Sequence, residues 1–115
     1  MAASPALPTP DLELTTEKNS GVTIVRGTGK INAASASVLQ STVRSAIPGS
    51  QRIVLDLTGV DYIDSTGLGA LVSIYMAARN ANCELELSNP KPRVSDLLKL
   101  TKLASVFEGH HGGGI

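Results

Sequence analysis

One short segment constrains the fold of this chain more than any other. It is Arg52–Leu57, which has the sequence Arg-Ile-Val-Leu-Asp-Leu. Its branched aliphatic residues are adjacent, so they point to both sides of an extended backbone. This pattern is typical of a strand covered on both faces, as the strands of parallel sheets are. Because parallel neighbours need a crossover connection, which is usually a helix, the segment predicts an α/β fold.

The spacing of the apolar residues supports this prediction. In some segments they alternate with polar residues, as in strands, and in others they recur every three or four residues, as in helices. The polar turn Asn19–Gly21 predicts that the first two strands form an antiparallel hairpin, with the second strand ended by Gly27 and Gly29. Helices packed on the sheet should carry the crossovers, so the sheet of about four to five strands is mostly parallel beyond the hairpin. The expected order is β-β-α-β-α-β-α, with strands near 12–16, 22–27, 52–57 and 83–87 and helices near 33–46, 65–81 and 94–101.

Length and composition fit one folded domain. The 115 residues are 42% hydrophobic but only 3% aromatic, so the core must be aliphatic. We expect the domain to span residues 11–108, with a short turn of helix near 103–107 at its end. A proline-rich disordered leader at 1–10 and a flexible glycine-rich tail at 109–115 should flank it.

Charge and cysteine content exclude several functions. Ten basic and ten acidic side chains balance, so the basic face needed for direct nucleic-acid binding is not expected. No apolar run approaches the roughly 18 residues that span a bilayer and no signal peptide is visible, so we expect a cytoplasmic protein without membrane insertion. Cys83 is the single cysteine, and His110 and His111 lack a third ligand, so neither a metal nor another cofactor is expected.

The candidate functional residues are concentrated at the junction between the third predicted strand and the second predicted helix. Asp64, Ser65 and Thr66 place a carboxylate and two hydroxyls at a helix start, where N–H groups lack partners and carry partial positive charge. Asp64 or Ser65 is either a simple N-cap or part of a site for an anion, including a phosphate on the chain's own serine. Glycine inside a helix costs about 1 kcal/mol relative to alanine. Two glycines at the start of this helix, Gly67 and Gly69, therefore suggest that another backbone or a partner must approach closely there.

These residues resemble a known family. Ile-Val-Leu-Asp-Leu at 53–57, followed by Tyr-Ile-Asp-Ser-Thr-Gly-Leu-Gly-Ala-Leu at 62–71, closely resembles the STAS domain of bacterial anti-sigma factor antagonists. The resemblance covers about residues 11–108 and implies a STAS fold. It implies that Ser65, or alternatively Thr66, is phosphorylated by an anti-sigma factor serine kinase. The unphosphorylated protein would bind this kinase and free a sigma factor, and a PP2C-type phosphatase would restore that state.

The resemblance also implies a partner-binding surface around the phosphorylated serine. It comprises Asp64, Ser65, Thr66, Gly67, Leu68, Tyr62, Lys30 and Asn32. Tyr62, Ile63 and Leu68 are candidates for an apolar contact patch, although burial under the sheet is the expectation for Ile63. The family usually has Gly-Glu-Leu/Ile-Asp where this chain has Gly-Lys-Ile-Asn at 29–32, so its partner should differ. Lys30 is either a solvated lysine or a contact for a phosphate on Ser65.

The sequence is also compatible with other functions. A STAS domain can be an unphosphorylated scaffold subunit of a stress-signalling complex, or a soluble subunit of a lipid or anion transporter. The helix start at Asp64 could also bind a nucleotide. No nucleophile, base and acid occur together, because the histidines lie in the tail, so an enzyme is not expected.

Overall fold

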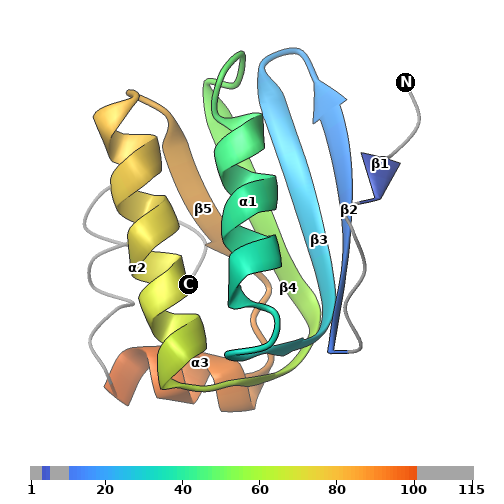
Figure 1. Ribbon diagram of the computed structural model, residues 1–115, viewed down its shortest axis with the longest axis vertical. Coiled ribbons are helices and arrows are strands. Elements are labelled where there is room, and N and C mark those ends of the chain that lie inside the picture. The colour runs from blue at the N-terminus through green and yellow to red at the C-terminus, as the bar shows by residue number, and fades with distance from the viewer. Residues whose placement is uncertain (1–3, 6–10, 101–115) are drawn as a thin grey trace.

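A computed structural model describes residues 4–5 and 11–100 of the chain. Its elements are the strands β1 (Ser4–Pro5), β2 (Leu12–Asn19), β3 (Val22–Ile31), β4 (Arg52–Ile63) and β5 (Glu84–Ser88), and the helices α1 (Ala36–Ala46), α2 (Ser65–Asn80) and α3 (Pro92–Leu100) (Figure 1). The predicted α/β class is confirmed, and so is the order of the elements from β2 to α3. β1 is an addition: it lies within the leader that was predicted to be disordered and pairs with β2. The predicted tail at 109–115, the helical turn at 103–107 and most of the leader lie outside the described residues.

The five strands form one sheet in the order β1-β2-β3-β4-β5. β2 is antiparallel to both β1 and β3, whereas β3, β4 and β5 are parallel. The β2–β3 hairpin turns at Ser20 and Gly21, whose φ angles of 51° and 84° are both positive. Two-residue turns of this kind match the right-handed twist of the strands that they join. The predicted hairpin and the parallel crossovers are therefore confirmed.

β3 does not end at Gly27 and Gly29, as the sequence pattern predicted, but continues to Ile31. Its register with β4 shifts twice, once next to each glycine. A bulge of this kind keeps two strands paired while one of them bends, so glycine inside a strand need not terminate it. The longer pairing carries β4 to Ile63 instead of Leu57 and brings the end of β3 beside the start of α2.

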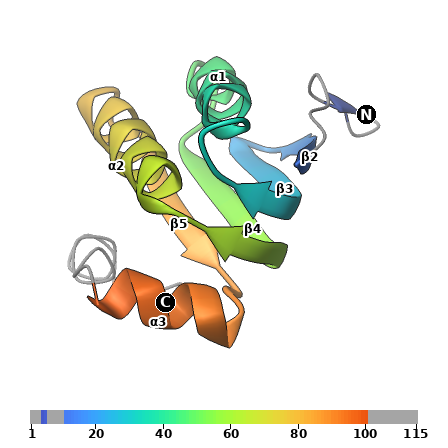
Figure 2. The same ribbon diagram turned by 60° about the horizontal axis from the view of Figure 1, so that its bottom comes forward.

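The helices divide between the two faces of the sheet. α1 and α2 pack side by side on one face, and α3 lies on the other face near the end of β4 (Figure 2). The core between the sheet and the paired helices is aliphatic, as predicted, and includes Leu12, Leu14, Val25, Leu39, Val43, Ile53, Leu55, Leu57, Leu71, Ile74 and Leu85. No helix within residues 11–100 is long and apolar enough to cross a bilayer.

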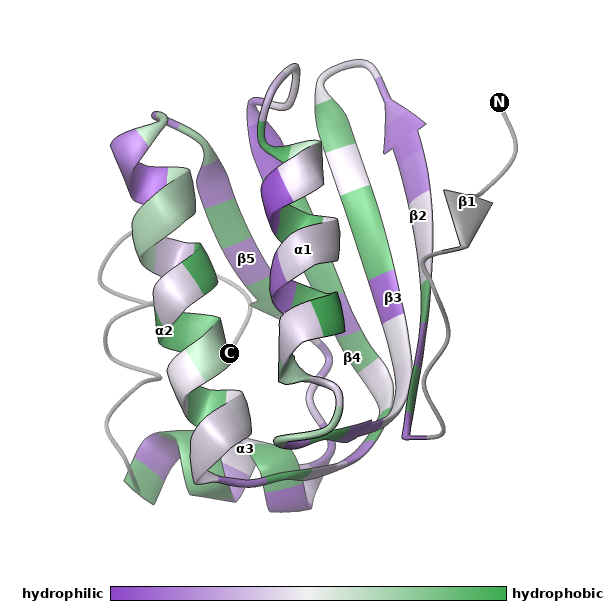
Figure 3. Ribbon diagram, viewed as in Figure 1, coloured by the Kyte–Doolittle hydropathy of each residue, from purple (hydrophilic) through white to green (hydrophobic). Residues whose placement is uncertain are grey.

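The prediction that the Arg52–Leu57 strand is covered on both faces is wrong. Val54 and Asp56 point away from α1 and α2 and are only half-buried. On that outer face Arg26 Nη1 lies 2.8 Å from Glu17 Oε1, and Arg26 also pairs with Asp56 at 3.8 Å. The strands consequently alternate hydrophobic and hydrophilic residues (Figure 3). Two right-handed crossovers that advance in the same direction place α1 and α2 on one face. The other face is polar around Val54 and Asp56, because α3 packs against it only near the end of β4.

Candidate functional site

The carboxylate of Asp64 caps helix α2. Asp64 has an extended backbone, with φ −115° and ψ −172°, and its Oδ1 accepts a hydrogen bond from the Gly67 N–H at 3.0 Å. Its carbonyl oxygen accepts the Leu68 N–H at 2.8 Å. This is the geometry of an N-cap residue, which satisfies one of the unpaired donors at a helix start. The N-cap interpretation of Asp64 is therefore confirmed.

Gly67 fixes the start of α2 against the end of β3. A Cβ atom at Gly67 would lie 2.3 Å from the Ile31 carbonyl oxygen, which also accepts the Asp64 N–H at 3.3 Å. At Gly69, by contrast, a Cβ would meet nothing within 4 Å. The close approach predicted from the two glycines thus occurs inside the chain at Gly67, while Gly69 has open space around it.

Ser65 and Thr66 form the first turn of α2, and both are exposed. Within the described part of the chain, neither hydroxyl forms a hydrogen bond. The preceding cap holds the backbone, so the two hydroxyls project from a fixed helix end that carries partial positive charge. Leu68 is half-buried and packs against the core.

Asn32 is held by bonds inside the chain. Its Oδ1 accepts the N–H groups of Ala34 at 3.0 Å and Ser35 at 3.2 Å, and its Nδ2 donates to Asp11 Oδ2 at 3.4 Å. The resulting turn delays the start of α1 to Ala36, three residues later than predicted. The Asn32 amide therefore has a structural role, and its contact with a partner stays a prediction.

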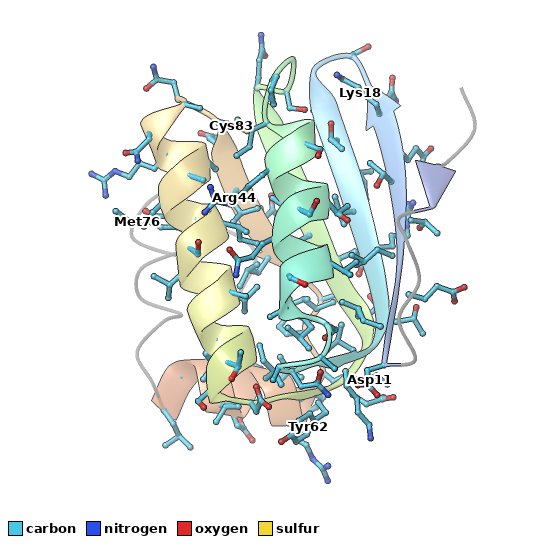
Figure 4. The ribbon with its side chains drawn as sticks, in the orientation of Figure 1. Asp11, Lys18, Arg44, Tyr62, Met76 and Cys83 are labelled. Carbon is cyan, nitrogen blue, oxygen red and sulfur yellow. The ribbon has the colours of Figure 1, made fainter. Side chains whose placement is uncertain are left out.

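Lys30 and Tyr62 lie opposite each other where β3 and β4 end. Both are exposed, and Tyr62 keeps 42% of its surface accessible. Of the apolar contact patch that the sequence suggested, Tyr62 alone is exposed, whereas Ile63 is buried and Leu68 is half-buried. Tyr62 lies with Asp11 at the end of the molecule where α2 begins (Figure 4).

An ion pair joins the end of β4 to the segment before α3. Lys91 Nζ lies 2.5 Å from Asp61 Oδ1. The hydrogen bond and charge of Lys91, with smaller effects of Lys30 and Arg93, lower the pKa of the Asp61 carboxyl. Lys91 and Arg93 were not among the predicted site residues. No local pattern could have indicated them, because about 30 residues separate the partners of this pair.

Substitutions of Asp64 distinguish the effect of its capping hydrogen bond on stability from the effect of its charge. We expect Asp64→Ala to lower the free energy of unfolding by about 1 kcal/mol, because the Gly67 N–H loses its acceptor. Asp64→Asn keeps an acceptor oxygen and is the matched control, with a loss of a few tenths of a kcal/mol. Urea denaturation followed by circular dichroism measures both. Equal losses in the two variants would contradict the capping role.

Comparison with known proteins places this chain in a family. Residues 13–111 match the family model described as the STAS domain. BtrV of Bordetella bronchiseptica, whose name classes it among the anti-sigma factor antagonists, is 32% identical over 97 residues, which cover 84% of each chain. An anti-sigma factor antagonist from Mycobacterium paratuberculosis has a TM-score of 0.75 at 24% identity, covering 88% of this chain and 87% of that one. Unphosphorylated SpoIIAA has a TM-score of 0.70 at 17% identity, covering 80% and 83%.

The chain therefore belongs to the STAS domain family, and the predicted STAS fold is confirmed. Within this family its sequence is similar to anti-sigma factor antagonists along most of its length. The two solved structures support the fold alone, because their identities are below 25%.

Proposed function

We propose that this protein is a cytoplasmic anti-sigma factor antagonist that binds an anti-sigma factor serine kinase while Ser65 is unphosphorylated. Binding of the kinase frees a sigma factor, and phosphorylation of Ser65 ends the binding until a PP2C-type phosphatase removes the phosphoryl group. The observation that carries the proposal is the exposed Ser65 hydroxyl on the rigidly capped first turn of α2. Similarity to anti-sigma factor antagonists supports it.

The charge of a phosphoryl group explains how such a site acts as a switch. Phosphorylation adds about −1.5 to −2 charges at neutral pH. The positive end of α2 tolerates this charge within the protein. A partner surface matched to a neutral hydroxyl would instead have to desolvate a dianion next to Asp64, which costs several kcal/mol. The fold itself need not change.

Substitutions at Ser65 test the proposal. We expect Ser65→Ala to bind the kinase in the presence of ATP without being released, and Ser65→Asp to bind at least about tenfold more weakly. Thr66→Ala is the matched control, because it removes the neighbouring exposed hydroxyl and should still be phosphorylated and released. Binding is measured by calorimetry with the kinase from the same cells, and the modified residue is identified by mass spectrometry.

The outcomes separate this function from the other STAS roles. Phosphoryl transfer to Thr66 instead of Ser65 would move the switch by one residue and contradict the assignment. A protein that co-purifies with a large complex or a transporter ATPase in constant ratio, whatever the substitution at Ser65, would favour the scaffold or transporter-subunit role.

A further inference from the structure

The two-residue strand β1 forms one edge of the sheet, next to the longer strand β2. β1 pairs with β2 alone, whereas β2 also pairs with β3 along its whole length. β1 and α2 lie on opposite sides of the molecule (Figures 1 and 2). The N–H and C=O groups at the edge of a sheet can pair with a strand from another chain. The position of β1 therefore bears on self-association, and it is remote from the site at Ser65.

β1 covers the middle of β2. Ser4 lies opposite Thr16 and Pro5 lies opposite Thr15, which are the two central residues of the strand Leu12–Asn19. Three residues of β2 lie on each side of this central pair. Most strands are about 5–6 residues long. Each flanking stretch is shorter than that, so the two residues of β1 prevent another chain from pairing with β2 over the usual length.

Pro5 makes β1 itself a poor edge for further pairing. In an antiparallel pair of strands, opposite residues that exchange two hydrogen bonds alternate with opposite residues that exchange none. Proline has no N–H, so the bonded pair is Ser4 with Thr16, and the nitrogen of Pro5 faces away from β2. A further strand would meet this nitrogen where it needs a donor, and such a position is typical of proline in edge strands.

The other edge of the described sheet is protected by charge. It is formed by β5, a strand of five residues that pairs with β4 alone. Glu84 and Glu86 alternate with the buried residues Leu85 and Leu87. Antiparallel pairing of two β5 strands would bring carboxylates of the two copies together, which is unfavourable. An uncovered β2 is thus the better edge for pairing between copies.

We propose that β1 covers the edge of β2 and thereby prevents this strand from pairing with a second copy of the chain. The occupant of an uncovered β2 would be β2 of the other copy, because two identical eight-residue strands can pair antiparallel over the usual length. The pairing would join the two sheets into one. This inference does not rest on the proposed function, because β1 acts on association whatever the state of Ser65.

Deletion of residues 2–5 removes β1 and tests the proposal. The deleted residues are uncharged, so the net charge of the chain stays at zero. We expect the unchanged protein to sediment as a monomer and the deletion variant to associate as its concentration rises, with an increase of about twofold in weight-average mass. A deletion variant that stays monomeric over the same concentration range would overturn the proposal.

Substitution of Thr16 in the deletion variant identifies the strand that pairs. The N–H of Thr16 points to β1, whereas those of Thr15 and Glu17 point to β3. Thr16→Pro therefore removes a donor from the edge without removing one from the hairpin, and it should restore the monomer. Thr16→Val is the matched control, because it keeps the N–H and favours a strand, and it should leave the association unchanged. Dimers that persist with Thr16→Pro would show that another surface associates and would overturn the proposal.

Amide hydrogen exchange in the unchanged protein gives a test that needs no folded variant. Because the Thr16 N–H is bonded to β1, it should exchange at least about tenfold more slowly than an unpaired amide. The Glu17 N–H, which belongs to the pair Glu17–Ile24 inside the hairpin, is the internal reference. If Thr16 exchanged as fast as an unpaired amide while Glu17 was protected, β1 would not cover β2 in solution.

Discussion

Replacing Gly67 by alanine is expected to lower the free energy of unfolding by about 1–3 kcal/mol. The new Cβ would lie 2.3 Å from the Ile31 carbonyl oxygen and 2.8 Å from Ile63 Cγ1, far inside van der Waals contact. α2 would have to move away from β3, which costs about 1–3 kcal/mol for overpacking and about 1 kcal/mol for the weakened Asp64–Ile31 hydrogen bond. The gain in helix propensity, about 1 kcal/mol, offsets only part of this loss.

Gly69 provides a matched control two residues further along the same helix. A Cβ there meets nothing within 4 Å, so Gly69→Ala should raise the free energy of unfolding by about 1 kcal/mol through helix propensity alone. Urea denaturation of both variants and the unchanged protein gives the comparison. If Gly67→Ala were as stable as Gly69→Ala, the close contact between α2 and β3 would not exist in solution.

Replacing Gly29 by alanine is expected to have a larger effect, a loss of about 3–5 kcal/mol, for a different reason. Its φ of +120° is a conformation that L side chains rarely adopt, and holding one there costs about 1–3 kcal/mol. The Cβ would also lie 2.1 Å from the Asp11 carbonyl oxygen, which accepts the Lys30 N–H at 2.7 Å. Strain, overpacking and a disturbed hydrogen bond therefore act together.

Gly27 is the matched control for this position, because it lies in the same strand without a positive φ. A Cβ at Gly27 would make ordinary contacts of 3.4–3.6 Å with Leu14, Val60 and Leu12 side chains. Gly27→Ala should therefore change the free energy of unfolding by less than about 1 kcal/mol. Thermal unfolding by calorimetry would distinguish the two variants. A loss below about 1 kcal/mol for Gly29→Ala would refute the strained bulge.

The junction at Asp64 was predictable because its determinants are local. The strand is followed by a carboxylate, two hydroxyls and a glycine, and then by helical periodicity. This order predicted the helix start and the cap. The β2–β3 hairpin was predictable for the same reason, since its turn residues are adjacent.

The different surroundings of the two glycines of α2 could not be predicted from the neighbouring sequence. Gly67 and Gly69 have the same propensity and nearly the same neighbours in the sequence, yet one touches β3 and the other touches nothing. Only the pairing of β3 with β4 as far as Ile31 brings a carbonyl oxygen to Gly67. The pairing continues beyond two register shifts. The glycines next to these shifts were predicted to end the strand, but a bulge lets the pairing continue.

The sequence by itself determined the order of the elements from β2 to α3, the parallel crossovers and the serine at the helix start, because periodicity and capping act between residues close in the chain. It did not determine where β3 and β4 end. The tertiary structure alone decided that α1 and α2 share one face, that Asn32 is held by Asp11, and that Lys91 neutralises Asp61. It also formed an apolar hollow between the end of β4 and α3. The two side-chain contacts join residues about 20 and 30 positions apart, and such distances depend on the packing of whole elements.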